Sequence, residues 1–237
     1  MNPSPLDVLI LADLHYTARA RHACAVTNRP KPLALMFIQK ALARLRDQGI
    51  TPGLILLLGD LVDDGDAPGS AEDLTQLAGE LLKTGIRILA VPGNHDSDPA
   101  RVAQLFDSAP GLHLVSGYGF LLFADQRVGN EHYVRTAGAL AEPAQAAAQH
   151  PGAPLIAVQH HPLHPAIRDP YPYMLDNNDE VLASFREARV LLSLSGHYPP
   201  GQPTHVHEGV AYNTASALTE APFAFQHLRL EGSRFEL

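Results

Sequence analysis

Five short apolar segments of this chain each end beside a side chain that can bind a metal ion. The side chains that follow the segments VLILA, LILLLG, IRILAVPG, PLIAVQ and VLLSLSG are Asp13 with His15, Asp60, Asn94 with His95, His160, and His197. Carboxylate, imidazole and amide groups without a thiolate suit Mn, Fe or Zn better than a structural zinc of the cysteine type. If these groups meet in space, they form a metal site.

Each of these motifs has an ordinary structural explanation when it stands alone. Asp13 and His15 would point to the same side of an extended chain, yet an isolated D-x-H is more often a loop cap beside a surface histidine. Asp60 could belong to a simple turn, and Asn94 tolerates the left-handed backbone of one. The joint occurrence at five predicted strand ends favours the metal site.

Alternating elements are expected to position these residues. Hydrophobic periodicity predicts strands at 7–12, 54–58 and 86–91. Helices are predicted at 33–48, from a capping box that begins at Ser70 to a stop at Gly85, and from Asp98 to Phe106. A β-α-β order favours parallel strands, and ligands bind outside the carboxyl ends of such strands. We therefore expect the metal-binding groups to share one edge of a sheet.

The second half of the chain is expected to add a second sheet. Two short strands within 112–124 begin it, and the further elements are helices at 139–149 and 178–188 and strands at 154–159, 190–194, 204–207, 210–214 and 223–230. No linker-like or low-complexity stretch interrupts the pattern. We expect one domain over residues 1–237.

Composition restricts the class of protein. The chain has 237 residues, of which 46% are hydrophobic and 18% charged, and a formal net charge of −8. This balance argues against sequence-independent binding of duplex nucleic acid. A single cysteine, Cys24, allows no internal disulfide, and the N-terminal segment lacks the basic region and cleavage site of a signal peptide. No apolar run approaches the roughly 18 residues of a membrane span, so we expect a cytoplasmic protein.

The motif order D-x-H, G-D-x-x-D, G-N-H-D, H-x-P and G-H resembles the calcineurin-like metallophosphoesterase superfamily, from Asp13 to the terminal strands. The double histidine before Pro162 and the L-x-N-x-x-E pattern of Leu175, Asn177 and Glu180 look most similar to its class III cyclic-nucleotide phosphodiesterase and Icc-like branch. The resemblance implies an α/β fold, a four-layer α/β/β/α sandwich of two mixed β-sheets. It also implies a binuclear metal centre at the carboxyl edge of the strands.

The resemblance also implies a role for each ligand. Asp60 would bridge two ions, which its two carboxylate oxygens allow. Two ions about 3.5–4 Å apart would clamp phosphoryl oxygens and activate a water for in-line attack. This predicts a hydrolase of small-molecule phosphoesters, with a nucleotide-like or other small diester as substrate. The first ion would be held by Asp13, His15 and Asp60, and the second by Asp60, Asn94, His160 and His197.

Two residues beside Asn94 are expected to be catalytic. By resemblance, His95 would not bind metal but would hydrogen-bond the phosphate or protonate the leaving oxygen. Asp96 would hold the His95 ring in its cationic form. Asp63 would orient a ligand or close a loop.

One departure from the family pattern concerns the first ion. The family motif G-H-x-H ends in a histidine, whereas this chain has Pro199 at that position. Proline cannot ligate, so the first site is expected to bind its ion more weakly than the second. His205 or His207 could replace the missing ligand, although both are more simply explained as residues of a strand.

The sequence leaves the substrate open. Arg19 and Arg29, in the loop after the first strand, fit either a solvated loop or a clamp on substrate phosphates. Tyr171 and Tyr173 fit either a lid over the site or an ordinary long loop. Three hypotheses remain: an enzyme that hydrolyses a diester, an enzyme that hydrolyses a monoester, and a binding or scaffold protein whose catalysis is weakened by Pro199. The oligomeric state cannot be inferred from the sequence.

Overall fold

The first sheet has five strands in the order β13-β12-β1-β2-β3 in the computed structural model, which describes residues 3–18 and 29–237. Strands β1, β2 and β3 are parallel, whereas β12, near the end of the chain, pairs with β1 in the antiparallel direction. The strands are β1 (Leu6–Leu11), β2 (Leu54–Leu58), β3 (Arg87–Val91), β12 (Gln226–Glu231) and β13 (Arg234–Glu236).

The second sheet has six strands in the order β10-β11-β9-β8-β5-β4. Its central strands β11, β9, β8 and β5 are parallel, and hairpins add β10 and β4 at its two edges. The strands are β4 (Gly111–Val115), β5 (Tyr118–Leu122), β8 (Leu155–Val158), β9 (Leu192–Ser195), β10 (Gln202–His207) and β11 (Val210–Thr214). Both sheets are therefore mixed, as predicted.

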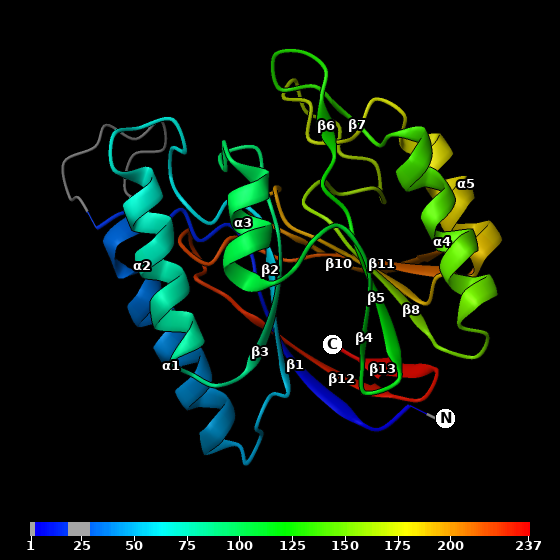
Figure 1. Ribbon diagram of the computed structural model, residues 1–237, viewed down its shortest axis with the longest axis horizontal. Coiled ribbons are helices and arrows are strands. Elements are labelled where there is room, and N and C mark those ends of the chain that lie inside the picture. The colour runs from blue at the N-terminus through cyan, green and yellow to red at the C-terminus, as the bar shows by residue number, and fades with distance from the viewer. Residues whose placement is uncertain (1–2, 19–28) are drawn as a thin grey trace.

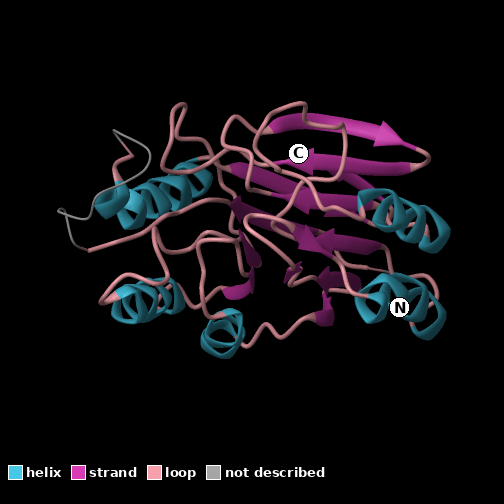
Figure 2. Cartoon of the chain, turned by 90° about the horizontal axis from the view of Figure 1, so that it is seen from above, coloured by secondary structure: helices cyan, strands magenta, loops and turns pink. Residues whose placement is uncertain are grey.

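The two sheets face each other, and helices cover their outer faces (Figure 1). The helices are η1 (Lys31–Leu33), α1 (Ala34–Asp47), α2 (Ser70–Leu82), α3 (Pro99–Phe106), α4 (Ala137–Gln149) and α5 (Asn178–Ala188). Alternation along β1 shows why: Val8 and Ile10 pack between the sheets, whereas Leu9 and Leu11 pack against α1 and α2. Seen from above, the order is helices, sheet, sheet, helices (Figure 2), which confirms the four-layer α/β/β/α sandwich.

Helix starts follow the sequence signals in one case and not in the other. Asp98 caps α3 as predicted, because its carboxylate accepts the backbone N–H of Arg101 at 2.9 Å. The capping box at Ser70 is wrong: the N-cap is Gly69, at φ +87°, and the Ser70 hydroxyl donates to the Gly65 carbonyl at 2.6 Å. Among the described residues, no helix combines the length and apolar character needed to cross a membrane.

Candidate metal centre and catalytic cleft

The carboxyl ends of β1 and β2 are joined by backbone hydrogen bonds that place Asp13, His15 and Asp60 side by side. The Asp13 N–H donates to the Gly59 carbonyl at 3.2 Å, and the His15 N–H donates to the Asp60 carbonyl at 2.8 Å. In the second sheet, the Gly196 N–H donates to the His160 carbonyl at 3.0 Å. The strand ends therefore meet at one edge, as the parallel order predicts.

Four of the predicted ligands have a left-handed backbone. Their φ angles are +51° at Asp13, +42° at His15, +51° at Asp60 and +68° at His197. The prediction that D-x-H continues an extended strand is therefore wrong, because β1 ends at Leu11. Such a backbone costs a non-glycine residue about 1–3 kcal/mol and is concentrated at functional sites. The chain accepts strain at the points where it presents these side chains.

Asp60 lies between two imidazole rings. Its Oδ2 is 3.5 Å from His15 Nε2, and its Oδ1 is 3.4 Å from His160 Nε2. Within the described part of the chain, ligand atoms no more than 4.8 Å apart form two groups, and Asp60 is common to both: His15, Asp60 and His95, and Asp60, His160 and His197. One oxygen faces each group, which is the arrangement that a bridging carboxylate needs.

Asn94 belongs with the second group. Its Oδ1 lies 3.0 Å from His160 Nε2. The other nitrogen of that ring, Nδ1, donates to the Leu58 carbonyl at 2.7 Å. A backbone acceptor on one ring nitrogen leaves the other directed at the centre, as is usual for metal-binding histidines.

Asp13 and His95 differ from their expected positions. Asp13 lies in neither group: its Oδ1 is 4.0 Å from His15 Nε2, and both its carboxylate oxygens accept the His197 N–H, at 3.2 and 3.1 Å. His95, expected to be no ligand, lies within reach of the first group. His95 therefore has a ligand atom close to those of His15 and Asp60, whereas Asp13 belongs to neither group.

Burial and neighbouring charges shift the pKa values at the centre. Burial raises the pKa of Asp13 to about 7 and lowers the pKa values of His15 and His197 well below their usual range. At His160 burial acts downward, but the Asp60 and Asp13 carboxylates and the hydrogen bond to the Leu58 carbonyl together outweigh it and raise the pKa to about 9. At Asp60 burial acts upward, and the charge and hydrogen bond of His160 outweigh it, so the pKa of that carboxyl is well below its usual range.

This donor set fits a divalent metal. The side chains of Asp13, His15, Asp60, His160 and His197 are all buried. His15 Nδ1 has no hydrogen-bond partner among the described residues. Buried carboxylates and imidazoles at this density are normally paired or bound to a cation. A bound cation would pair with these carboxylates and with one nitrogen of each imidazole ring.

Asp96 does not hold the His95 ring, so its predicted role is wrong. Its carboxylate accepts the backbone N–H groups of Leu61 at 3.0 Å and Gly93 at 2.8 Å, and it therefore fixes the loops that present Asp60 and Asn94. Burial, and then the nearby Asp60, raise the pKa of Asp96 to about 6. The His95 ring is held instead by a backbone carbonyl: its Nδ1 donates to the Asp63 carbonyl at 2.6 Å.

Arg29 is paired with acidic side chains. Its guanidinium donates to Glu220, and its NH1 lies 3.6 Å from the Asp63 carboxylate. Asp63 also forms an ion pair with Lys31, so it closes this loop as predicted. Arg29 lines the cleft beside the metal centre. Arg19, the other predicted substrate residue, lies outside the described residues.

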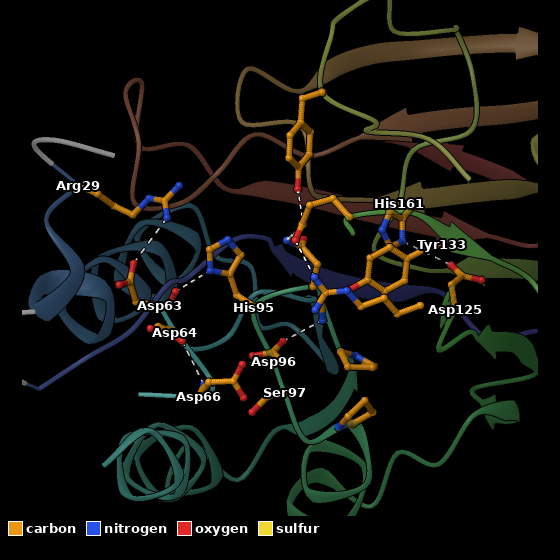
Figure 3. Close-up of a pocket in the computed structure, with 18 residues that line it drawn as sticks. Arg29, Asp63, Asp64, Asp66, His95, Asp96, Ser97, Asp125, Tyr133 and His161 are labelled. Atoms are coloured by element: carbon orange, nitrogen blue, oxygen red, sulfur yellow. Dashed lines mark hydrogen bonds and ion pairs between the residues drawn. The ribbon is translucent and has the colours of Figure 1, made fainter. Parts of the chain in front are cut away.

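A cleft of about 840 Å³ opens beside the centre (Figure 3). Arg29, Asp63 and His95 lie on one side of it, and Tyr133, His161 and Asp125 on the other (Figure 3). The second side includes the hairpin of β6 (Gln126–Arg127) and β7 (Tyr133–Val134), which the sequence analysis missed. Tyr171 lines the cleft as well.

Asp125 and His161 form a buried pair that the sequence analysis also missed. His161 Nδ1 lies 3.7 Å from Asp125 Oδ2, and the Asp125 carboxylate accepts two bonds from Arg135 at 2.9 and 3.1 Å. Burial would raise the pKa of Asp125, but Arg135 and His161 together outweigh it and lower that pKa to about 2. The signal was present in the sequence, because Asp125 follows the predicted strand within 112–124.

Pro199 is not replaced by a nearby histidine in the described part of the chain. The His207 ring stacks on His164 with 4.3 Å between centroids, and neither His205 nor His207 belongs to either ligand group. The Pro199 carbonyl accepts the Ala217 N–H at 3.0 Å. The departure from the G-H-x-H pattern therefore persists in three dimensions.

Comparison with known proteins settles the family. A family model described as calcineurin-like phosphoesterase matches residues 6–200. The chain belongs to the calcineurin-like phosphoesterase family. It is therefore a hydrolase of phosphoesters that depends on metal, and its His and Asp groups indicate a divalent metal centre. No curated protein sequence matches the chain.

Solved structures share the fold of this phosphoesterase at low sequence identity. A dimetal phosphatase from Danio rerio, LOC 393393, has a TM-score of 0.75 at 16% identity, covering 95% of this chain and 92% of that one. The protein TT1561 of Thermus thermophilus has a TM-score of 0.59 at 15% identity, covering 98% of this chain and 100% of that one. GAP50, the anchor in the inner membrane complex of Plasmodium, has a TM-score of 0.58 at 14% identity, with coverage of 95% and 81%.

Proposed function

We propose that this phosphoesterase binds two metal ions on either side of Asp60 and hydrolyses small phosphodiesters, including nucleotide-like ones. The observation that carries the proposal is that Asp60 is shared by two groups of ligand atoms, with one oxygen toward His15 and the other toward His160. Carboxylate, imidazole and amide donors suit Mn, Fe or Zn. When bound, two such ions would polarise the phosphoryl group and supply an activated water.

His95 is the residue proposed to act on the leaving group. Its Nδ1 proton is engaged by the Asp63 carbonyl, which leaves Nε2 to contact the phosphate or give a proton to the departing oxygen. Its ring packs edge to face against His15, with centroids 4.7 Å apart. His95 therefore reaches the reacting phosphate from the side of the first ligand group.

The charge of the cleft supports a diester over a monoester. Six carboxylates and two guanidinium groups line it: Asp63, Asp64, Asp66, Asp96, Asp125 and Glu131, with Arg29 and Arg127. A monoester carries about −1.5 to −2 charges at pH 7, whereas a diester carries one. Bound metal ions would offset part of this acidic excess, but the side chains around them still disfavour the second charge, and the volume of the cleft leaves room for a second ester group.

The test compares substrates on protein reconstituted with Mn²⁺. We expect hydrolysis of bis(p-nitrophenyl) phosphate or a cyclic nucleotide to exceed that of p-nitrophenyl phosphate. Activity on the monoester alone would refute the diesterase proposal and favour a phosphomonoesterase. A metal titration accompanies the assay. Because Pro199 supplies no ligand, we expect the group with His15 to bind more weakly than the group with His160, and two equally tight ions would contradict this.

A binding or scaffold protein is the second candidate, and Pro199 is the observation that favours it. GAP50 is described as an anchor in a membrane complex, so one protein of this fold has such a role. Retention of His95 and of both ligand groups supports the enzyme, because a scaffold has no need of them. Failure to hydrolyse every substrate, together with no bound transition metal, would favour the scaffold.

A further inference from the structure

One carboxylate in the cleft accepts hydrogen bonds from three different segments of the chain. Glu131 Oε2 accepts from the Tyr171 hydroxyl at 2.8 Å and from Asn94 Nδ2 at 3.3 Å. Glu131 Oε1 accepts from Arg127 at 2.9 Å. Asn94 follows β3 of the first sheet, whereas Arg127 and Glu131 belong to the β6–β7 hairpin. Glu131 thus connects the hairpin to the loop that carries a proposed metal ligand.

The orientation of the Asn94 amide matters for metal binding. Its oxygen and nitrogen ends have nearly the same shape, but only the oxygen can bind a cation. A carboxylate is only an acceptor, so Glu131 can bind the NH₂ end alone. With Nδ2 at Glu131, Oδ1 faces His160 Nε2 at 3.0 Å. Once His160 binds metal through Nε2, this atom can no longer donate to Asn94 Oδ1. Among the described side chains, Glu131 then still holds the Asn94 amide in this orientation.

Glu131 is itself held in a defined position. Its backbone is left-handed, with φ +61°, which costs a non-glycine residue about 1–3 kcal/mol. Arg127 binds one of its carboxylate oxygens and Tyr171 binds the other. Burial, together with the hydrogen bond to Glu131, raises the pKa of Tyr171 above its usual value. The carboxylate therefore has little freedom to leave Asn94.

We propose that Glu131 is a positioning residue, which orients the Asn94 amide so that its oxygen faces the second metal ion. The proposal rests on the proposed function, because it takes Asn94 as a ligand. Hydrogen-bond partners of metal ligands contribute about 10–100-fold to metal affinity. Glu131 would contribute in the same way, from a hairpin that has no ligand of its own.

The test is a Mn²⁺ titration of the full chain, with free Mn²⁺ measured by electron paramagnetic resonance. We expect Glu131→Ala to weaken the tighter site by about tenfold or more. Glu131→Gln keeps an acceptor of the same length. Because two donors lie at the Oε2 position and one at Oε1, its carbonyl oxygen would take the Oε2 position and still bind Asn94. We therefore expect its affinity to stay within about threefold of the wild type.

Glu208→Ala is the matched control. Glu208 also has a left-handed backbone, at φ +48°, lies in the turn between β10 and β11, and pairs with Arg186 at 3.0 Å, but it contacts no residue of the site. We expect no change in Mn²⁺ affinity. Circular dichroism checks that each variant folds. If the alanine variant does not fold, Glu131→Gln still tests the proposal, because a loss of Mn²⁺ affinity in that variant would contradict the positioning role.

Each outcome separates this proposal from the proposed function. Unchanged affinity in Glu131→Ala overturns the positioning role. Equal losses in Glu131→Gln and Glu131→Ala overturn it too, because they would mean that the negative charge attracts the ion and the amide needs no orientation. Wild-type protein that binds Mn²⁺ but hydrolyses no phosphoester overturns the proposed function and leaves the titration result standing. Wild-type protein that binds no Mn²⁺ overturns both.

Discussion

The buried pair of Asp125 and Arg135 gives the most direct test of how charge is held beside the cleft. The Asp125 side chain is 2% exposed and that of Arg135 is 0% exposed. Arg135 also donates to Gln159 at 3.1 Å and lies 3.8 Å from the centre of the Phe123 ring. Asp125→Asn keeps the shape of the side chain but removes its charge and replaces one of the two oxygens that accept from Arg135 with an NH₂ donor. The guanidinium would then stay buried without a counter-ion.

The expected loss can be worked out from the pKa of Asp125. A fall from 3.8 to about 2, at about 1.4 kcal/mol per pH unit, corresponds to about 2 kcal/mol of the free energy of unfolding at neutral pH. Removing one partner of a buried pair costs about 3–5 kcal/mol, because the other charge remains uncompensated. The second effect is the larger. We expect Asp125→Asn to lower the free energy of unfolding by about 3–5 kcal/mol at pH 7.

The pH dependence has a defined sign. The pKa of Asp125 is lower in the folded protein than in the unfolded chain, so the unfolded chain takes up the proton first as the pH falls. The contribution is complete above the unfolded value of 3.8 and is lost as the pH approaches about 2. The difference in stability between wild type and Asp125→Asn should therefore shrink by about 2 kcal/mol over this range.

Urea unfolding followed by far-ultraviolet circular dichroism measures both effects. Asp176→Asn is the control, because Asp176 pairs with His132 at 2.8 Å but both side chains are exposed, and such pairs contribute about 0–1 kcal/mol. A loss below about 1 kcal/mol for Asp125→Asn at pH 7 would refute the reasoning. So would a difference from wild type that stays constant as the pH falls from about 5 to about 2.

Two further substitutions test the metal centre. His95→Ala should lower kcat by about 10²–10⁴-fold while metal content at the group with His160 is retained; loss of that metal would show that His95 is needed for ion binding. Gly93→Ala should reduce metal content, because its Cβ would lie 2.1 Å from Asp60 Oδ1. Its control is Gly79→Ala in α2, where, apart from its chain neighbours and its own helix backbone, no atom of the described residues lies within 4 Å of the added Cβ, and a gain of about 0.5–1 kcal/mol in the free energy of unfolding is expected. Equal metal content in both glycine variants would contradict this.

The fold and the edge that carries the site could be predicted because both depend on short-range patterns. Buried parallel strands appear as continuous apolar runs, such as that of β2, and the residues after them must share an edge once the strands are parallel. This placed Asp60, Asn94, His160 and His197 together. The same rule applies to Asp125 after β5, whose strand is parallel to β8, so its place at the cleft was open to prediction.

Other features depend on geometry that no short pattern encodes. The left-handed turns at Asp13 and His15 lie where the loops after β1 and β2 bond to each other, and Asp13 belongs to neither ligand group. The sequence neighbours His95 and Asp96 point to different partners because the backbone turns between them. Glu131 lies in a hairpin with strands of two residues each, which are too short to show periodicity.

The strain and the buried charge at this edge have a common explanation. Left-handed ligands, a carboxyl at Asp13 with a pKa of about 7, and imidazoles at His15 and His197 that burial keeps neutral would all cost stability in a protein without a ligand. Cations would compensate the buried charge and the unpaired rings, because they bind neutral imidazole and ionised carboxylate, and their binding energy would offset the backbone strain. Their binding stabilises the folded state by an amount that grows with the logarithm of the ratio of free ion concentration to dissociation constant. The features that make the edge unfavourable by itself are thus those that would favour a metal centre, and Asp96 connects the loops that present Asp60 and Asn94.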